Sequence, residues 1–418
     1  MRASIHRIST TWPRTSCRIR TNALHAQTQT PTSISALGVL SHWRATDDGR
    51  DGLVWSPKEG PVSLESCPPD SEHRASYEAL RGPETDADNI HEASLEAYGH
   101  RVLNSAHPLL KAELTHKAWR EYKAGKITLF SETPVATALP DAPARPARPA
   151  LVAARQIPLL KNSPLSPPAY TLHNLAHVEL NAIDLAWDSM ARFAPLRLPR
   201  GFYEDFCRVA DDESRHLGWT LQRMKELGTH YGDMPAHNLL WDGCIASAAD
   251  VRERLAVVPM SQEARGLDAG GRLSERLVGW GDNVSAAIVA RISEEERQHV
   301  AVGTYWFSLI CDALKQDGQE VFVDTLIALT PDLLRPPFND AARESVGLPR
   351  RYYDETLWSD EDRARIDAVR AERKQTNPDG SGMPGVDEAN AARRPALTPV
   401  DADQLRRRLA AFLQFEEE

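Results

Sequence analysis

The sequence has no Cys-x-x-Cys pair, and its five cysteines are scattered singly along 418 residues. This spacing excludes a zinc-ribbon or rubredoxin-type site and indicates a reducing compartment. No apolar run approaches the ~20 residues of a membrane-spanning helix, so we expect no membrane span. A formal net charge of −10 argues against broad nucleic-acid binding. With 41% hydrophobic and 26% charged residues, the composition is that of a soluble globular protein.

Acidic residues are absent from the start of the chain, where the first is Asp47. The same stretch has six arginines and many Ser and Thr, a composition typical of a peptide that targets a protein to an organelle. We therefore predict that residues 1–46 are an organellar transit peptide or are disordered, in a eukaryotic protein. Mitochondrion and plastid stay open as destinations, and the alternative is a cytoplasmic protein with a basic tail.

Two Glu-x-x-His steps mark the centre of the chain, one from Glu213 to His216 and one from Glu296 to His299. Residues three apart lie on one face of an α-helix, so each step can present a carboxylate and an imidazole to the same metal ion. One such step is common by chance. Two steps become informative when the sequence also supplies matching carboxylates.

Two further glutamates supply that match. Glu179 precedes Glu213 by 34 residues, and Glu263 precedes Glu296 by 33. Glu179 lies on an otherwise apolar helical stripe, where a carboxylate is costly to bury unless it is paired or metal-bound. Two helices with Glu-x-x-His and two helices with one Glu each form the di-iron or di-manganese site of ferritin-like bundles. We therefore predict that these six residues bind two iron ions, or manganese, with buried salt bridges as the alternative.

The predicted fold is all-α, a ferritin-like four-helix bundle with a long crossover, formed by residues 151–335. Its helices are expected at about 168–194, 201–227, 244–265 and 283–315, with the crossover at 229–243, a short helix at 271–280 and a further helix at 318–330. Pro259 is expected to kink or break the third helix.

Extensions are predicted on both sides of the bundle. Residues 47–150 are expected to hold one helix, at about 107–124, followed by a Pro-rich linker. Residues 336–418 are predicted to be a C-terminal extension with helices, disordered in part, that ends in an amphipathic helix at 400–415.

Four polar residues near the predicted ligands are candidates for orienting them. His173 and His177 form an i, i+4 pair just before Glu179, and Asp212 and Arg215 flank Glu213. We expect these four to hydrogen-bond to the metal ligands, because such outer partners fix the orientation of a ligand. The alternatives for the histidines are core packing or a metal-linked role of their own. Asp212 and Arg215 could instead pair with each other or lie on a solvated face.

Several separated motifs resemble one known family over about residues 100–350. They are, in chain order, Arg145-Pro146-Ala-Arg148-Pro149-Ala-Leu151-Val152, His173…His177-Val-Glu179, Ala210-Asp211-Asp212-Glu213-Ser-Arg215-His216, Tyr231-Gly232-Asp233-Met-Pro235-Ala-His237-Asn-Leu-Leu-Trp241, Glu263-Ala-Arg265-Gly266-Leu267-Asp268 and Glu296-x-x-His299-Val300-x-x-Gly303-x-x-Trp306. The sequence resembles the ferritin-like family catalogued as domain of unknown function 455. The resemblance implies a ferritin-like bundle with a di-metal centre, and it implies no substrate.

The predicted ligand set favours redox chemistry. Four carboxylates and two imidazoles suit iron or manganese better than zinc or copper. Our leading hypothesis is a di-iron oxidoreductase that uses dioxygen on an unknown substrate, with an electron donor protein as a candidate partner. The alternatives are a non-catalytic iron-handling protein and, by fold analogy alone, a tRNA-modifying hydroxylase. The oligomeric state stays open.

Overall fold

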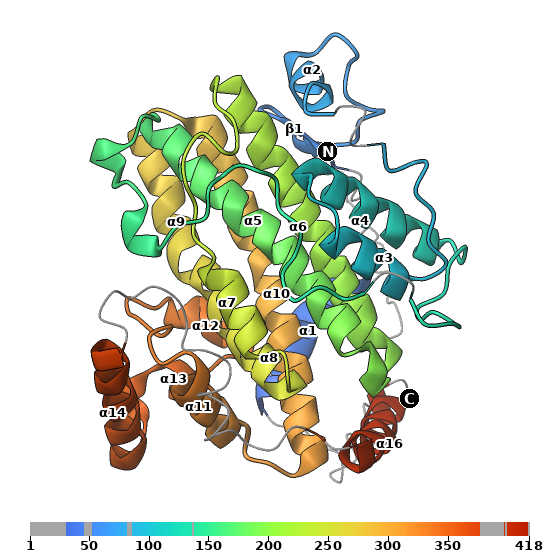
Figure 1. Ribbon diagram of the computed structural model, residues 1–418, viewed down its shortest axis with the longest axis vertical. Helices are drawn as coiled ribbons and strands as arrows, with labels where there is room; N and C mark the ends of the chain where they lie inside the picture. Colours follow the sequence, from blue (N-terminus) through green and yellow to red (C-terminus); the bar gives the residue numbers. More distant parts are fainter. Residues whose placement is uncertain are drawn as a thin grey trace, which may run out of the picture.

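The computed structural model describes residues 31–45, 52–81, 86–135, 138–376, 397 and 399–416. Helices dominate these residues, and four long helical segments form a bundle (Figure 1). The segments are α5 (Pro167–Arg192), α6 (Arg200–Glu226), a composite of α8 (Val251–Val257), η6 (Val258–Glu263) and α9 (Ala264–Gly279), and α10 (Asn283–Leu314). The expected all-α fold is therefore confirmed, and three of the four helices lie within two residues of the predicted bounds.

Two hairpins make up the bundle, α5 with α6 and α9 with α10. The connection between them runs back along the length of the bundle and contains α7 (Leu239–Ala246) (Figure 1). The sequence predicts one helix over 244–265, but α7 ends at Ala246 and a new helix begins at Val251. The cause is Asp250, whose carboxylate accepts a hydrogen bond from the backbone N–H of Arg252 at 2.8 Å and so caps the start of α8.

Pro259 widens the third segment without breaking it. Because proline has no N–H, the ordinary α-helical hydrogen bond is missing there. The chain forms the π-helical segment η6, and the Ser261 hydroxyl donates to the carbonyl of Ala256 at 2.7 Å. The helix then continues to Gly279, so the separate helix expected at 271–280 is part of α9. Gly303 of α10 permits this packing, since a Cβ there would lie 2.5 Å from the Pro259 Cβ.

The N-terminal extension contains more structure than the single helix we expected. It forms the hairpin of β1 (Val54–Ser56) and β2 (Gly60–Val62), followed by α2 (Glu72–Glu78), α3 (Leu95–Leu103) and α4 (Pro108–Lys123). The missed helices α2 and α3 are short, and each is begun by a serine cap, Ser71 and Ser94. Helix α3 packs on α5 and α4 packs on α6. Lys111 of α4 is fully buried and pairs with Asp184 of α5 at 2.6 Å.

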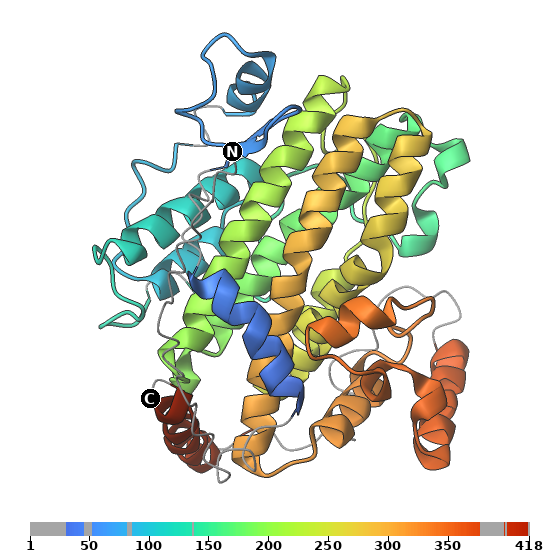
Figure 2. The ribbon, with the colours of Figure 1, turned by 180° about the vertical axis from the view of Figure 1, so that it is seen from behind.

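The structured chain starts before residue 46, which corrects our N-terminal boundary. Residues 31–45 form α1 (Pro31–Ala45), and this helix crosses the back of the bundle over α10 and α6 (Figure 2). Ala36, Leu40 and Trp43 are buried. Their spacing of four and three residues places them on one face of the helix, which explains the docking. The predicted transit peptide otherwise falls on residues 1–30, outside the described residues.

In the view of Figure 1, the C-terminal extension packs around the lower end of the bundle. It contains α11 (Gly318–Leu329), α12 (Asp340–Ser345), α13 (Arg350–Tyr353), α14 (Asp360–Thr376) and α16 (Pro399–Glu416). Helix α16 matches the predicted terminal amphipathic helix, and its Leu405 and Leu409 are buried as it packs against α10. The disorder predicted after about residue 370 falls mainly on residues 377–396, which lie outside the described residues.

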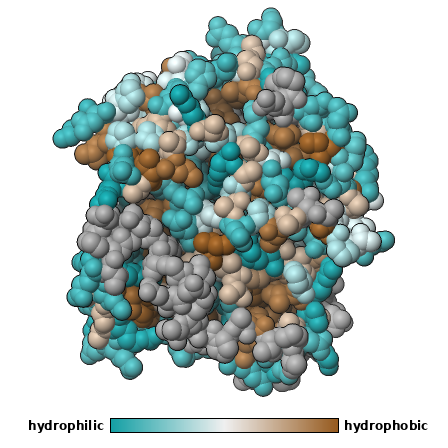
Figure 3. Space-filling model, in the orientation of Figure 1, coloured by the Kyte–Doolittle hydropathy of each residue, from teal (hydrophilic) through white to brown (hydrophobic). Residues whose placement is uncertain are grey.

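The surface in the view of Figure 3 is mostly hydrophilic, with separate hydrophobic side chains between the polar ones. Within the described residues, every helix is either too short or too polar to cross a membrane.

The docking of α1 generates the first prediction. Leu40→Ala should lower the free energy of unfolding by about 2–5 kcal/mol, because it leaves a cavity under a fully buried side chain. Gly38→Ala is the matched control in the same helix. Gly38 is exposed with nothing within 4 Å of an added Cβ, so this change should stabilise by roughly 0.4–1 kcal/mol. Urea unfolding measures both, and an unchanged stability for Leu40→Ala would mean that α1 does not dock in solution.

Candidate metal centre

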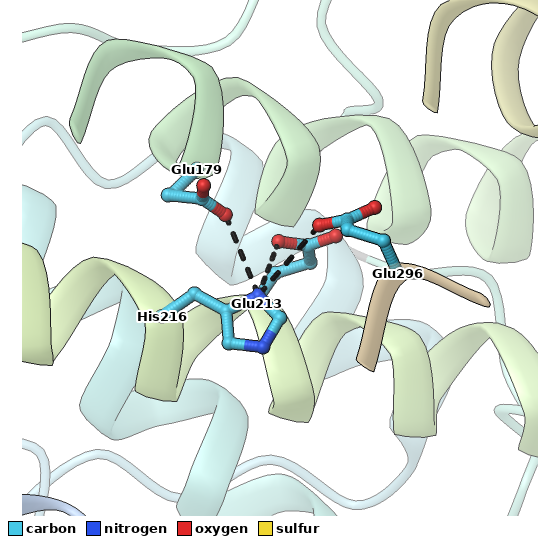
Figure 4. A group of neighbouring side chains, drawn as sticks. All are labelled: Glu179, Glu213, His216 and Glu296. Atoms are coloured by element: carbon cyan, nitrogen blue, oxygen red, sulfur yellow. Dashed lines mark hydrogen bonds and ion pairs between the residues drawn. The ribbon is translucent and has the colours of Figure 1, made fainter. Parts of the chain in front are cut away.

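The structure brings the six predicted ligands together in the middle of the bundle. Each of the two helical hairpins contributes three of them. The ligands are Glu179 on α5, Glu213 and His216 on α6, Glu263 at the end of η6, and Glu296 and His299 on α10. Four of them, from three separate helices, offer one ligand atom each within 4.8 Å of one another. Figure 4 shows these four side chains, Glu179, Glu213, His216 and Glu296, converging on one point.

The first half of the cluster is centred on His216. Its Nδ1 lies 3.2 Å from Glu213 Oε2, 3.5 Å from Glu179 Oε2 and 3.8 Å from Glu296 Oε1. The three carboxylates therefore surround one imidazole nitrogen from three helices.

The second half is centred on His299. Its Nδ1 lies 2.9 Å from Glu213 Oε1 and 3.6 Å from Glu296 Oε2. Glu213 and Glu296 thus turn one oxygen toward each imidazole, and the two rings have centroids 5.8 Å apart. Glu263 is close enough to His299, Glu296 and Glu213 to interact electrostatically with all three. Two carboxylates are shared between the halves, and each half has one carboxylate of its own.

Several ligand atoms are buried without a hydrogen bond, which is the observation that fits a metal. These atoms are Glu179 Oε2, Glu213 Oε1, Glu263 Oε2 and His299 Nδ1, of which Glu213 Oε1 and His299 Nδ1 face each other at 2.9 Å as an ion pair without hydrogen-bond geometry. Leaving a buried donor or acceptor unsatisfied costs about 1–3 kcal/mol, and more for charged groups. Atoms of this kind, gathered from four helices, are suited to coordinate metal ions, so the donor set fits a di-metal centre.

The pKa shifts of these side chains show how the cluster balances its charge without metal. Burial raises the pKa of Glu179 well above its usual range, and the neighbouring Glu213 adds to the rise. Burial likewise raises the pKa of Glu263 to about 8. For the two imidazoles burial works against protonation, yet the surrounding carboxylates raise the pKa of His216 and of His299 well above normal. Protons thus stand in for the positive charge that a metal would bring.

The Nε2 atom of each imidazole contacts an acidic side chain of the opposite hairpin. His216 Nε2 lies 2.9 Å from Glu295 Oε2, and His299 Nε2 lies 3.4 Å from Asp212 Oδ2. These acids directly precede the glutamates of the two Glu-x-x-His steps, so the acid of one step supports the histidine of the other. Such a carboxylate orients the ring and leaves Nδ1 as the nitrogen that faces the ligand cluster.

Arg215 ties the two supporting acids together. Its buried guanidinium donates to Asp212 Oδ1 at 2.6 Å and to Glu295 Oε2 at 3.1 Å. Burial opposes ionisation of Glu295, but His216 and Arg215 outweigh it and lower the pKa of that carboxyl to about 2. The sequence did place Asp212 and Arg215 near the ligands. It missed Glu295, which could have been found because an acid precedes the glutamate in both steps.

His173 and His177 do not support the ligands, which corrects our expectation. His177 lies two residues before Glu179, about 200° around the helix, and so faces away from the cluster. Its ring contacts the Tyr231 hydroxyl and the His237 carbonyl, both at 2.7 Å. His173 Nε2 accepts a hydrogen bond from the backbone N–H of Gly232 at 3.0 Å. The two histidines hold the crossover against α5.

Trp43 is a further residue that the sequence did not suggest. Its indole Nε1 donates to Asp212 Oδ2 at 3.0 Å, so α1 reaches the same carboxylate that faces His299. No local pattern connects the two, because 169 residues separate them.

Comparison with known proteins agrees with these motifs. The model of the family described as Protein of unknown function (DUF455) matches residues 104–354. The chain belongs to this family. A protein of Haemophilus influenzae described as an uncharacterized protein is 35% identical over 214 residues, which cover 50% of this chain and 74% of the relative. No solved structure matches significantly. The DUF455 match contains all six candidate ligands with Asp212, Arg215 and Glu295, while Trp43 precedes it.

The raised pKa of Glu263 generates the second prediction. A carboxyl whose pKa rises on folding, here from 4.5 to about 8, keeps its proton in the folded chain and loses it in the unfolded chain. Wild-type stability from this group therefore falls as pH rises through that interval. Glu263→Gln removes the ionisation, so the metal-free variant should melt at a higher temperature than wild type. The difference in melting temperature between the two metal-free proteins should grow from pH 4.5 to pH 8. In iron-loaded protein, the same substitution should lower the metal content.

Scanning calorimetry of both chelator-treated proteins across that pH range measures this difference. Glu263→Gln melting below wild type at pH 8 would contradict this account of the carboxyl.

Proposed function

We propose that this protein is a di-iron carboxylate oxidoreductase that uses dioxygen. The observation that carries the proposal is the sharing of Glu213 and Glu296, each with one oxygen toward His216 and one toward His299. Ferritin-like di-iron proteins use the same set, a Glu-x-x-His from each of two helices and a Glu from each of two others. The long connection between the hairpins also supports a ferritin-like assignment.

In this proposal, each metal ion takes ligands from both hairpins. His216 and Glu179 would hold one ion, His299 and Glu263 would hold the other, and Glu213 and Glu296 would be shared. Carboxylate oxygens with imidazole suit iron, and manganese is the alternative ion. Two ferrous ions bound in such a set can supply two electrons to dioxygen.

The remaining residues of the centre orient ligands and exclude water. Asp212 and Glu295 fix the imidazole rings, and Arg215 fixes both acids. The ring centroids of Trp219 and His216 are 5.5 Å apart, and the indole covers the imidazole on one side. Glu263 is the most exposed of the six ligand residues, although its Oε2 is buried, so we expect a substrate to approach from the η6 side.

The proposal also concerns partners and location. Repeated turnover needs electrons, which we expect a donor protein to supply. The acid-free N-terminal stretch supports delivery to a mitochondrion or plastid, with the cytoplasm as the alternative.

Three consecutive acids on α10 provide a matched test of the proposal. Glu296→Gln should reduce iron content from about two ions per chain and slow oxygen uptake about tenfold or more, because it removes a shared ligand. Glu213→Gln should do the same from the other hairpin. Glu294→Gln, a change of the exposed acid two residues before Glu296, should alter neither quantity.

Elemental analysis gives the iron content, and an oxygen electrode records uptake after anaerobic loading with Fe(II). Wild-type protein that holds no iron would remove the proposal. Oxygen uptake with accumulation of iron mineral, and no organic product, would favour the iron-handling function instead.

A further inference from the structure

A buried hydrogen-bond chain links α1 to the His299 half of the metal centre. The Trp43 indole donates to Asp212 Oδ2 at 3.0 Å, and the same oxygen lies 3.4 Å from His299 Nε2. Trp43 is 2% exposed, and Asp212 and His299 are fully buried. In the low-dielectric interior such contacts are strong, and a change at one end is felt at the other.

The two halves of the centre are supported differently. On the His216 side, Glu295 is held by Arg215 and by Arg291, whose guanidinium lies 2.7 Å from Glu295 Oε1. Both arginines belong to the bundle helices. On the His299 side, Asp212 is held by Arg215 and by Trp43, and Trp43 belongs to a separate helix that precedes the bundle by more than a hundred residues. The His299 side therefore receives one of its supporting contacts from α1.

The environment of Trp43 fixes its ring in this position. The guanidinium of Arg208 stacks over the indole, 4.4 Å from its centroid. One residue further along α1, Arg44 pairs with Asp205 of α6, and Trp306 of α10 donates to the same carboxylate at 2.8 Å. The Arg44 guanidinium also lies 4.9 Å from the centroid of the Tyr305 ring of α10, so α1 is anchored to both α6 and α10 beside the indole.

We propose that α1 completes the metal centre through Trp43, a positioning residue that holds Asp212 and thereby His299, so that the second metal ion binds at full strength only when α1 is docked. The inference rests on the proposed metal centre and deepens it. Loss of the outer hydrogen-bond partner of a metal ligand, which here is Asp212, typically costs 10–100-fold in metal affinity, so loss of the group that holds this partner should cost about tenfold. A consequence is that any N-terminal processing compatible with function must leave residues 31–45 in place.

Cobalt(II) titration of the full-length protein under anaerobic conditions tests the inference, because visible absorption reports binding without catalysis. Wild type should bind two ions. Trp43→Phe keeps an aromatic ring but removes the indole N–H. It should raise the dissociation constant of one cobalt ion about tenfold and leave that of the other within twofold of wild type. The weakened ion should be the one lost in Glu263→Gln, on the His299 side, and not the one lost in Glu179→Gln.

Trp187→Phe is the matched control. Trp187 is also a buried indole donor, but it donates to Thr115 Oγ1 of α4 at 2.8 Å, and its ring lies beside Gly99 of α3. This variant should bind both ions as wild type does. Leu40→Ala loosens α1 without changing the indole, and it should reproduce the selective weakening even if Trp43→Phe fails to fold.

A double-mutant cycle separates positioning from general loosening. If Trp43 acts through Asp212, adding Trp43→Phe to Asp212→Asn should cause no further loss of the second ion. Equal weakening of both ions, unchanged binding in Trp43→Phe and Leu40→Ala, or additive losses in the cycle would each overturn the inference. Wild-type protein that binds no cobalt or iron would instead remove the metal centre itself.

Discussion

The mutual repulsion of four carboxylates enclosed in one bundle is the constraint on which the rest of the structure depends. Glu179, Glu213, Glu263 and Glu296 meet in a region where burial alone raises the pKa of a carboxyl. Without added positive charge, protons on the carboxyls and on His216 and His299 must relieve the repulsion. A packed bundle would not retain such a cluster for stability, since apolar residues of similar volume are often as stable or more stable there. The cluster therefore supports the proposed metal binding.

The same constraint accounts for the exchange of supporting acids between the hairpins. An imidazole that must present Nδ1 to the centre needs a partner at Nε2, and that partner lies on the facing helix. Asp212 and Glu295 add negative charge, which the buried Arg215 offsets by binding both of them. Neither hairpin therefore contains a complete half-site, and the packing of α6 against α10 is inseparable from the geometry of the ligands.

Elements outside the bundle reinforce this arrangement from two directions. The crossover is fixed to α5 by His173 and His177, and Ala150 at the end of the Pro-rich linker accepts a backbone hydrogen bond from Ala236 at 3.0 Å. On the opposite face, α1 contacts the acid behind His299. The protein thus uses its extensions to hold the centre, which explains why α1 has a buried face in a region whose composition suggests only targeting.

The sequence by itself determined the long helices and the six candidate ligands, because helical periodicity and the spacing of Glu-x-x-His are local properties that survive in any tertiary context. It also located Pro259 as the irregular point of the third segment. Tertiary structure alone decided how that irregularity resolves, since Gly303 on another helix makes room for a π-helical turn at Pro259. Tertiary structure alone also decided that Glu295, and not His177, contacts a ligand imidazole, because this contact depends on which helices face each other. Trp43 and Asp212 meet only through the docking of α1, a contact across 169 residues that no local pattern encodes.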